Sequence, residues 1–385
     1  MQEIKFIKTE GTPNGSSSCC GTSGQESAAS CCSTTSQVQS FVIGSVTTAA
    51  GPVPKIVTTW TSSDTWGMVR SRSGGYRMRY TVEPGLYAVG EPTPDSDVFV
   101  TANYKLTFDI LRRSLAGMNA WVLALDTKSI NVWCAAGKGT FGTEELATRI
   151  SAARLSEVVA HRKLILPQLG AVGVNAAEIR KRTGFRVAFG PVEARDIPAY
   201  VRGNYKKTPE MRTIRFSLLD RMILTPMELN PALQKYPWFA LAVLLLFGFQ
   251  PSGILFRDAF FGGLPFLALG LVAVFAGAFL TPVLLPFVPF RSFALKGLVM
   301  GVAALAALEA AAPSFFPAGL MRLAAYLLFP ALTSYLALQF TGATTYTGMS
   351  GVKKELKLAV PAYFAASGLS VLLVIAHKFQ TWRMQ

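Results

Sequence analysis

Two hydrophobic patterns divide the chain near residue 236. Beyond that point the apolar residues form long stretches, whereas before it they form short runs between polar residues. Five stretches suit membrane-spanning helices: residues 237–256, 264–285, 293–312, 320–340 and 358–377. Each is close to the ~20 apolar residues that a helix needs to cross a bilayer. We therefore expect an all-α transmembrane domain of about five helices.

The pattern before residue 206 alternates between strands and helices. Apolar runs or strict alternation predict strands at residues 76–82, 98–101, 121–125, 164–167 and 185–189. Helical spacing predicts helices at residues 104–115, 143–155, 176–183 and 195–201, the second of them with Thr143 as its N-cap. Strands that alternate with helices favour a mostly parallel, doubly wound (Rossmann-like) α/β sheet. Ligands of such sheets bind at the carboxyl ends of the strands.

Composition gives the domain boundaries. We expect a flexible Cys/Ser/Gly-rich tail at residues 1–45, an α/β domain at 46–205, a basic linker at 206–236 and a transmembrane domain at 237–385. The tail carries two adjacent cysteine pairs, Cys19-Cys20 and Cys31-Cys32. Adjacent cysteines do not match the C-x2-C spacing of zinc sites. Two interpretations stay open: a tail that binds no metal, and four exposed thiolates that bind a soft metal ion.

The distribution of charge indicates how the chain is oriented in the membrane. The chain has 37 Lys and Arg against 22 Asp and Glu, a formal net charge of +15. No dense basic run is interleaved with aromatic residues, so we expect no nucleic-acid partner. Basic residues gather before the first apolar stretch, and the N-terminus lacks the apolar run of a secretory signal. We therefore expect a multi-pass protein of the cytoplasmic (inner) membrane, with lipid as a partner, a cytosolic N-terminal domain and a C-terminus outside.

One cysteine lies inside the expected α/β domain. Cys134 follows the buried strand at residues 121–125, in the segment TKSINVWCAAGKGTFG. This segment is not a phosphate loop, because Val132 and Gly139 occupy positions where that motif needs Gly and Ser or Thr. A helix N-terminus and Lys138 one turn away would both favour the thiolate, which binds metals or attacks electrophiles. The alternative is a buried, inert cysteine. The chain has only two His and no HExxH or GxGxxG pattern, so a bound metal would take a sulfur ligand.

The segment around Cys134 resembles the signature of a known family. Residues 131–141, NVWCAAGKGTF, resemble the signature of the mercury-methylating corrinoid proteins (the HgcA family). The resemblance extends to PGLYA (84–88), VTANYKLTFD (100–109), HRKLILPQL (161–169) and ARDIPA (194–199), and covers roughly residues 50–205. Several of these segments are also similar to the corrinoid domain of the corrinoid iron-sulfur protein of acetyl-CoA synthesis. A cytosolic corrinoid domain followed by five spans is the layout of the mercury-methylating family, whereas a Cys-rich tail is not part of its pattern.

The resemblance implies a cofactor and the residues that hold it. The cofactor is a cobalamin-type corrinoid, bound with its own base off the cobalt, and Cys134 would be the lower axial cobalt ligand. The segment beneath the ring would comprise Asn131, Val132, Trp133, Ala135, Ala136, Gly137, Lys138, Gly139, Thr140 and Phe141. The ring edge and nucleotide tail would contact Thr101, Asn103, Thr107, Pro167, Gln168, Gly170 and Gly190. The small residues beneath the ring suit a close approach of the backbone to a flat macrocycle.

The implied activity is that of a corrinoid-dependent methyltransferase, which transfers a methyl group from methyl-Co(III) corrinoid to Hg(II) and forms methylmercury. The implied partners are a small [4Fe-4S] ferredoxin-like protein, as electron donor and candidate for Hg(II) delivery, and a folate-linked methyl donor or methyltransferase. Mercury is then also the soft metal that Cys19, Cys20, Cys31 and Cys32 would bind. Two alternatives stay open: a methyl carrier of one-carbon and acetyl-CoA metabolism, and a polytopic transporter with a cytosolic ligand-sensing domain.

Overall fold

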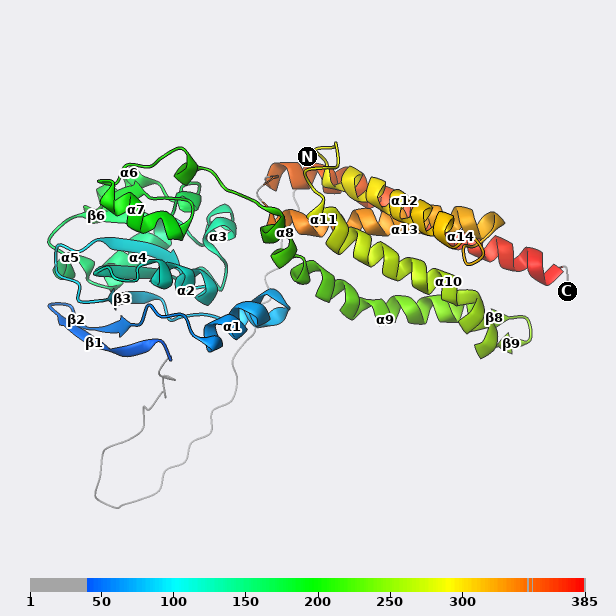
Figure 1. The fold of residues 1–385 in the computed structure, drawn as a ribbon, viewed down its shortest axis with the longest axis horizontal. Helices are drawn as coiled ribbons and strands as arrows, with labels where there is room; N and C mark the ends of the chain where they lie inside the picture. The colour runs from blue at the N-terminus through cyan, green and yellow to red at the C-terminus, as the bar shows by residue number, and fades with distance from the viewer. Residues whose placement is uncertain (1–39, 345, 348, 384–385) are drawn as a thin grey trace, which may run out of the picture. The chain divides into compact units, whose positions relative to one another are not determined.

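The computed structural model describes residues 40–344, 346–347 and 349–383, and Figure 1 shows the order of their elements. The four tail cysteines, Cys19, Cys20, Cys31 and Cys32, lie outside the described residues, and so does most of the expected tail. Within the described residues an α/β part is followed by a helical C-terminal part. The two parts differ in the way that their apolar residues are buried, as the sequence pattern predicts.

The α/β part is built on a seven-stranded sheet with the order β1-β2-β3-β5-β4-β6-β7. Its strands are β1 (Val42–Thr48), β2 (Gly51–Ile56), β3 (Gly85–Val89), β4 (Val98–Ala102), β5 (Ala120–Leu125), β6 (Lys163–Leu166) and β7 (Arg186–Phe189). Four pairings are parallel (β2 with β3, β4 with β5, β4 with β6, and β6 with β7). The pairings of β1 with β2 and of β3 with β5 are antiparallel. The sheet is therefore mixed, because three strands that the sequence pattern did not predict, β1 to β3, add two antiparallel pairings.

Helices cover both faces of this sheet. They are α1 (Ser62–Arg72), α2 (Lys105–Ser114), α3 (Val132–Lys138), α4 (Thr143–Ala152), α5 (Leu155–Val158), α6 (Ala176–Thr183) and α7 (Ile197–Arg202). Short 3-10 turns lie at η1 (Gly75–Arg79), η2 (Gln168–Gly170), η3 (Ala194–Asp196) and η4 (Glu210–Arg212). Along β4, Val98 and Val100 belong to the core that contains α4 and α6, while Phe99 belongs to the core that contains α2 and α7. Two cores explain why the central strands are continuous apolar runs.

Two local predictions are wrong in detail. The expected strand at residues 76–82 is the 3-10 turn η1, after which Thr81 forms only an isolated bridge to Tyr104. The helix expected from Thr143 begins there, but its N-cap is Gly142, and the Thr143 hydroxyl accepts a hydrogen bond from the Asn175 N–H at 2.9 Å. That helix ends at Ala152 because Arg154 adopts a left-handed conformation with φ 44°.

The C-terminal part is helical. It comprises α8 (Leu218–Leu224), α9 (Pro226–Gly248), α10 (Phe256–Phe275), the π-helical turn η5 (Ala276–Leu280), α11 (Thr281–Val283), α12 (Phe293–Ala311), α13 (Gly319–Gln339), the 3-10 turn η6 (Phe340–Ala343) and α14 (Met349–Arg383). The strands β8 (Phe249–Gln250) and β9 (Gly253–Ile254) form a hairpin between α9 and α10. Close helix contacts depend on glycine: a Cβ atom on Gly301 of α12 would lie 2.7 Å from Cα of Pro330 in α13.

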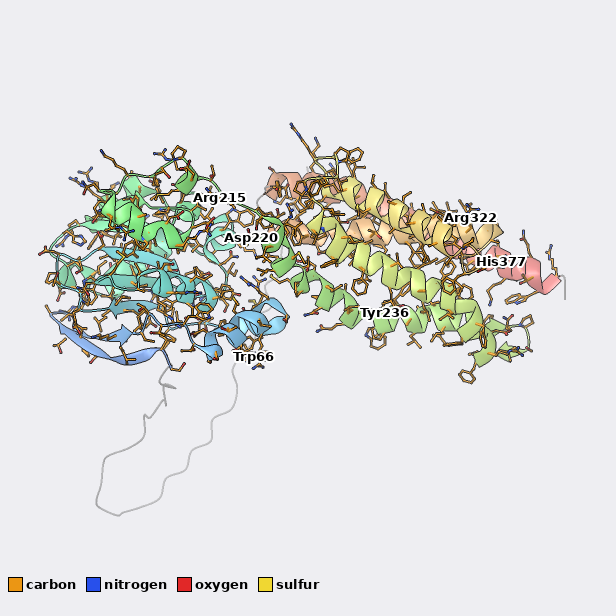
Figure 2. All side chains as sticks on the ribbon, in the orientation of Figure 1. Trp66, Arg215, Asp220, Tyr236, Arg322 and His377 are labelled. Atoms are coloured by element: carbon orange, nitrogen blue, oxygen red, sulfur yellow. The ribbon has the colours of Figure 1, made fainter. Side chains whose placement is uncertain are left out.

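Four helical segments among the described residues are long and apolar enough to cross a membrane: Phe256–Val283, Phe293–Ala311, Gly319–Gly342 and Ser350–Arg383. The first of the five expected spans is not among them. Its apolar residues form the second half of α9, and the β8–β9 hairpin ends the helix before the apolar stretch is complete. Arg322, labelled in Figure 2, is a charged residue of the helical part, and its guanidinium lies 2.6 Å from the Glu309 carboxylate.

Candidate functional site

A cavity of about 870 Å³ opens at the carboxyl ends of the parallel strands. Its wall contains Thr101 from β4, Pro167 after β6 and Gly190 after β7. The start of α3, which follows β5, and residues of α2 also line it. This is the position that the doubly wound pattern predicts for a ligand, because the loops that follow parallel strands meet at one edge of the sheet.

The structure brings some of the predicted site residues to this wall. They are Thr101, Thr107, Asn131, Val132, Trp133, Pro167 and Gly190. The other predicted residues are not on the wall: Asn103, Cys134, Ala135, Ala136, Gly137, Lys138, Gly139, Thr140, Phe141, Gln168 and Gly170. Several of these residues support the cavity wall from behind, since Ala135, Ala136 and Phe141 belong to the hydrophobic core. Their roles toward a cofactor stay predictions.

Asn103 is one of these supports. It is buried, and its side-chain oxygen accepts hydrogen bonds from the backbone N–H and the hydroxyl of Thr127, both at 3.0 Å. Thr127 in turn donates to the carbonyl of Ile130 at 2.6 Å. These bonds fix the loop between β5 and α3, in which Lys128 and Ser129 both have positive φ. The loop therefore presents the start of α3 to the cavity in one defined position.

The helix α3 is short and capped at both ends. The Asn131 side chain accepts a hydrogen bond from the Cys134 N–H at 2.9 Å, which is the N-cap interaction expected of asparagine. At the other end Gly139 adopts the left-handed conformation of a helix C-cap, with φ 82°. The caps explain how only seven residues, VWCAAGK, form a helix between two turns.

Cys134 lies on this helix in a half-buried position. Its Sγ atom is 3.7 Å from the carbonyl oxygen of Gly342, to which the thiol donates. Burial raises the pKa of the thiol, although the positive charges of Arg77 and Lys138 act in the opposite direction. The expectation that the thiolate is favoured is therefore wrong for the structure as it stands: Lys138 acts as predicted, but burial outweighs it. No group of three or more His, Cys, Asp or Glu residues in the described part of the chain could hold a metal ion.

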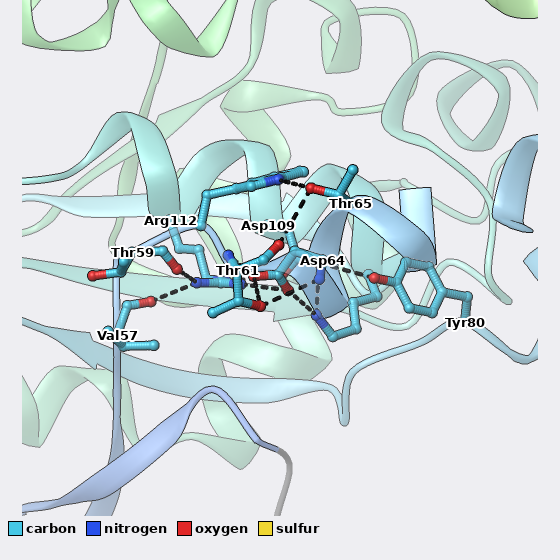
Figure 3. A network of polar contacts seen from close by, with 10 residues as sticks. Val57, Thr59, Thr61, Asp64, Thr65, Tyr80, Asp109 and Arg112 are labelled. Atoms are coloured by element: carbon cyan, nitrogen blue, oxygen red, sulfur yellow. Dashed lines mark hydrogen bonds and ion pairs between the residues drawn. The ribbon is translucent and has the colours of Figure 1, made fainter. Parts of the chain in front are cut away.

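A buried ionic network lies beside the cavity (Figure 3). Arg112 of α2 contacts two carboxylates, Asp109 at 2.7 Å and Asp64 of α1 at 2.8 Å. Lys105 also contacts both carboxylates, at 2.6 Å for Asp109 and 3.3 Å for Asp64. Burial alone would raise the pKa of Asp64, but hydrogen bonds from the Thr61 N–H and from Arg112 bring it down to about 2. The network therefore joins α1 to α2 through ionised groups.

Sequence reasoning missed part of the cavity wall. Trp60 and Met68 come from the segment before η1, and Ile110, Arg113 and Ser114 come from α2. The α2 residues could have been found, because Thr107, Ile110 and Ser114 follow one another at helical spacing on one face. No local pattern marks Trp60, which reaches the wall only through the tertiary contacts of its neighbours.

Comparisons with known proteins find similarity over about a third of the chain. Residues 76–201 match the family described as CO dehydrogenase/acetyl-CoA synthase delta subunit. Similar proteins include the acetyl-CoA decarbonylase/synthase complex subunit gamma of Archaeoglobus fulgidus, 33% identical over 126 residues, which are 32% of this chain and 26% of that protein. The subunit gamma of Methanopyrus kandleri is 30% identical over 122 residues, with 31% and 26% covered. Subunit gamma 1 of Methanosarcina thermophila is 32% identical over 133 residues, with 34% and 28% covered.

The chain thus spans about a quarter of the length of the curated relatives that it matches. The matched range contains β3 to β7 and α3, and therefore most of the cavity wall. The segment that carries Trp60 and Met68 and the C-terminal helices lie outside it. The finer resemblance to the mercury-methylating family stays a prediction. At the level that the comparisons reach, residues 76–201 match the CO dehydrogenase/acetyl-CoA synthase delta subunit family, and about a third of the chain is similar to acetyl-CoA decarbonylase/synthase subunits gamma.

Proposed function

We propose that the α/β part binds a cobalamin-type corrinoid and serves as a methyl carrier. The observation that carries this proposal is the cavity at the carboxyl ends of the strands, most of whose wall lies in residues 76–201, the range that matches the CO dehydrogenase/acetyl-CoA synthase delta subunit family. The resemblance of residues 131–141 to corrinoid-protein signatures supports the same cofactor. A bound corrinoid would supply cobalt that accepts and releases a methyl group, which amino-acid side chains cannot do well.

The residues present fit such a cofactor. A cavity of about 870 Å³ is at the upper end of the size of small-molecule sites. Apolar side chains such as Phe99, Val100 and Ile110 line it, while Thr101, Thr107 and Asn131 place polar groups on the same wall. A corrinoid has a ring with apolar faces and amide groups around its edge. We propose that the apolar residues contact the ring and that the polar residues bind its amides.

We propose that α3 lies beneath the ring, with its position fixed by the Asn131 cap. Cys134 would then be the residue that supplies a sulfur ligand to the cobalt. In the structure its thiol donates to the Gly342 carbonyl, so ligation would require that this hydrogen bond breaks and that the thiol loses its proton. Metal binding commonly displaces such protons.

Two methyl acceptors are considered. The comparisons favour a carrier of one-carbon and acetyl-CoA metabolism, because all three relatives are named as subunits of an acetyl-CoA decarbonylase/synthase complex. A specific observation favours Hg(II): Cys134 stands on a capped helix beside the cavity, in the segment that resembles the mercury-methylating signature. A thiolate is a soft, strongly donating ligand, so Cys134 would favour a cobalt centre that gives its methyl group to a soft metal ion such as Hg(II). We propose a folate-linked methyl donor and a ferredoxin-like electron donor for either acceptor.

We also propose that the C-terminal helices anchor the protein in the cytoplasmic membrane, with the α/β part in the cytosol. The four long apolar helices support this. The transporter alternative is less well supported, because a polar substrate path needs accessible charges inside the membrane, and Glu309 and Arg322 pair with each other. The domain boundaries near residues 45, 205 and 236 belong to this proposal.

The test uses the full chain, purified without oxygen in detergent and supplied with methylcobalamin. We expect the wild type to retain corrinoid through gel filtration. The variant Cys134→Ala should retain it with a changed absorption spectrum and lose methylmercury formation from Hg(II). A variant with Ser at positions 19, 20, 31 and 32 is the control, because it keeps Cys134 as its only thiol.

Each result decides one level of the proposal. A wild type that retains no corrinoid would contradict the carrier function altogether. Methylmercury formation at the wild-type rate by Cys134→Ala would remove the role of Cys134, and a wild type that retains corrinoid but forms no methylmercury would leave the acetyl-CoA carrier. A loss in the tail variant alone would assign the mercury chemistry to the tail cysteines.

A further inference from the structure

Two neighbouring arginines of α2 have opposite environments. The Arg112 side chain is 1% exposed and is paired with two carboxylates. Arg113 is exposed, lies on the cavity wall, and has no hydrogen-bond or carboxylate partner among the residues that the structure describes. Its guanidinium carbon lies 5.2 Å from the centre of the Trp60 ring. The charge of Arg112 is thus compensated within the fold, whereas the guanidinium of Arg113 is free to bind a ligand.

Arg112 fixes the position of Trp60. Its Nη1 donates to the carbonyls of Val57 at 2.8 Å and Thr59 at 2.9 Å, directly before Trp60 (Figure 3). Four residues after Trp60, the ion pair between Arg112 and Asp64 anchors the start of α1. The indole N–H of Trp60 donates to the Thr65 hydroxyl at 2.9 Å. Held on both sides, the indole ring provides a rigid surface on which the Arg113 guanidinium rests.

The charge on the cavity wall is unbalanced. Within the described residues the wall carries three charged side chains, Arg113, Glu193 and Arg195. Glu193 and Arg195 neutralise each other, with the carboxylate oxygen 2.5 Å from Nε. Arg113 therefore remains as the uncompensated cation beside a mostly apolar cavity. A guanidinium that no carboxylate compensates can bind a ligand anion through charge-assisted hydrogen bonds.

We propose that Arg113, positioned by Trp60, binds an anionic group of the ligand in this cavity. Resting on the proposed function, we identify that group as the phosphodiester of the nucleotide loop of a complete corrinoid. The amide groups around a corrin ring are neutral, so the phosphodiester is the anionic substituent that the cofactor offers. A guanidinium matches two phosphate oxygens with two parallel N–H donors. The segment that carries Trp60, outside the range that matches the family, would thus select corrinoids that have the loop.

The test compares two ligands, cobalamin and cobinamide, which has the corrin ring without the phosphate-bearing nucleotide loop. Binding to the full-length protein is measured by absorption for the wild type, Arg113→Gln and Arg180→Gln. Arg180 is an exposed arginine of α6 outside the cavity wall and serves as the matched control for loss of charge. We expect Arg113→Gln to weaken cobalamin binding about tenfold, the size of one charge-assisted hydrogen bond, and to leave cobinamide binding unchanged. Arg180→Gln should change neither.

The role of Trp60 is tested by combining substitutions. Trp60→Ala should reduce the preference for cobalamin in the wild type but have little further effect on that preference in Arg113→Gln, because the two residues act as a unit. Trp60→Phe, which keeps an aromatic ring, should restore most of the preference. Additive losses in the double variant would show that Trp60 acts independently of Arg113 and would overturn its positioning role.

The outcomes separate this inference from the proposed function. Equal loss of both ligands in Arg113→Gln would mean that Arg113 contacts the ring, and loss of neither would mean that it contacts nothing. Either result overturns the phosphate assignment while the corrinoid proposal stands. A wild type that binds neither cobalamin nor cobinamide contradicts the proposed function itself, and the phosphate assignment falls with it.

Discussion

The α/β part buries its apolar side chains, whereas the helical part exposes many of its own. In the α/β part, all six residues of β5, AWVLAL, are buried between the two covered faces of the sheet. In the helical part, only 17% of the most apolar stretch of α14 is buried, and the Phe364 side chain is 76% exposed. Apolar side chains in that position are stable only when another apolar medium covers them. The contrast is the physical basis for the proposal that lipid surrounds the C-terminal helices.

The two parts also treat buried cations differently. Arg112 in the α/β part is balanced by the carboxylates of Asp64 and Asp109. Lys296 in the helical part is 8% exposed and donates to the backbone carbonyls of Leu285 and Val288, which follow α11. Backbone carbonyls of the turn after α11 thus accept the ammonium protons without a carboxylate. We infer that the α/β part depends on ionic pairing and the helical part on close backbone packing.

The largest expected effect comes from Arg112→Ala. This change leaves two buried carboxylates without their partner and should destabilise the α/β part by about 3–5 kcal/mol. Hydrogen exchange of the full chain, followed by mass spectrometry, would show faster exchange across β2, α1 and α2, with α12 and α13 unchanged. Arg113→Ala is the matched control and should cost less than about 0.5 kcal/mol, because its side chain is exposed. Equal effects of the two variants would contradict the ionic account.

The second effect tests the helical part. In Gly301→Ala the new Cβ would lie 2.7 Å from Pro330 Cα and 2.9 Å from Thr333 Cβ, so α12 and α13 must separate. Overpacking of this kind costs about 1–3 kcal/mol, and it should lower the thermal midpoint of the protein in detergent. Gly368→Ala in α14 is the control, since nothing lies within 4 Å of its Cβ position. If both variants melted alike, close packing at Gly301 would not be what holds these helices.

The elements that sequence reasoning found are those with a strong local pattern. The strands β4 and β5 are continuous apolar runs, and α2 and α6 have helical spacing. The strands β1 and β2 were missed because their sequences, VIGSVTT and GPVPKI, contain Gly or Pro and do not form continuous apolar runs. The alternation at residues 76–82 was misleading, since Tyr76 and Tyr80 pack against each other in a 3-10 turn with ring centres 5.3 Å apart.

The position of the candidate site was predictable, because it follows from the topology of the sheet. The carboxyl ends of parallel strands locate the cavity, and the capped segment after β5 was identified in advance. The contribution of Trp60 was not predictable, because it depends on Arg112, which lies 52 positions later in the chain and holds the carbonyls of Val57 and Thr59. The direction of the Cys134 pKa shift was not predictable either, because it depends on burial rather than on nearby charges in the sequence.

Acid should weaken the ionic network around Asp64 without a substitution. The pKa of Asp64 is about 2 in the folded chain, below its ordinary value of 3.8. The ionised group therefore contributes stability above pH 4, and this contribution is lost as the pH falls toward 2. Its size is up to about 2 kcal/mol. We expect Asp64→Asn to be less stable than the wild type at pH 7, with a difference that shrinks between pH 4 and 2 in urea unfolding curves of the full chain. A constant difference would show that ionisation of Asp64 is not involved.

The smallest effect should be local to the candidate site. Asn131→Ala removes the hydrogen bond from the Cys134 N–H, and loss of an N-cap costs about 1 kcal/mol. Because α3 has only seven residues, this cost should appear as fraying of its first turn and about fivefold faster alkylation of Cys134. Asn175→Ala removes the equivalent cap of α6, where Asn175 accepts from Ala177 and Glu178, and should leave the alkylation rate unchanged. Faster alkylation in both variants would mean that Cys134 is exposed by general loosening of the α/β part, and the local account of α3 would then be wrong.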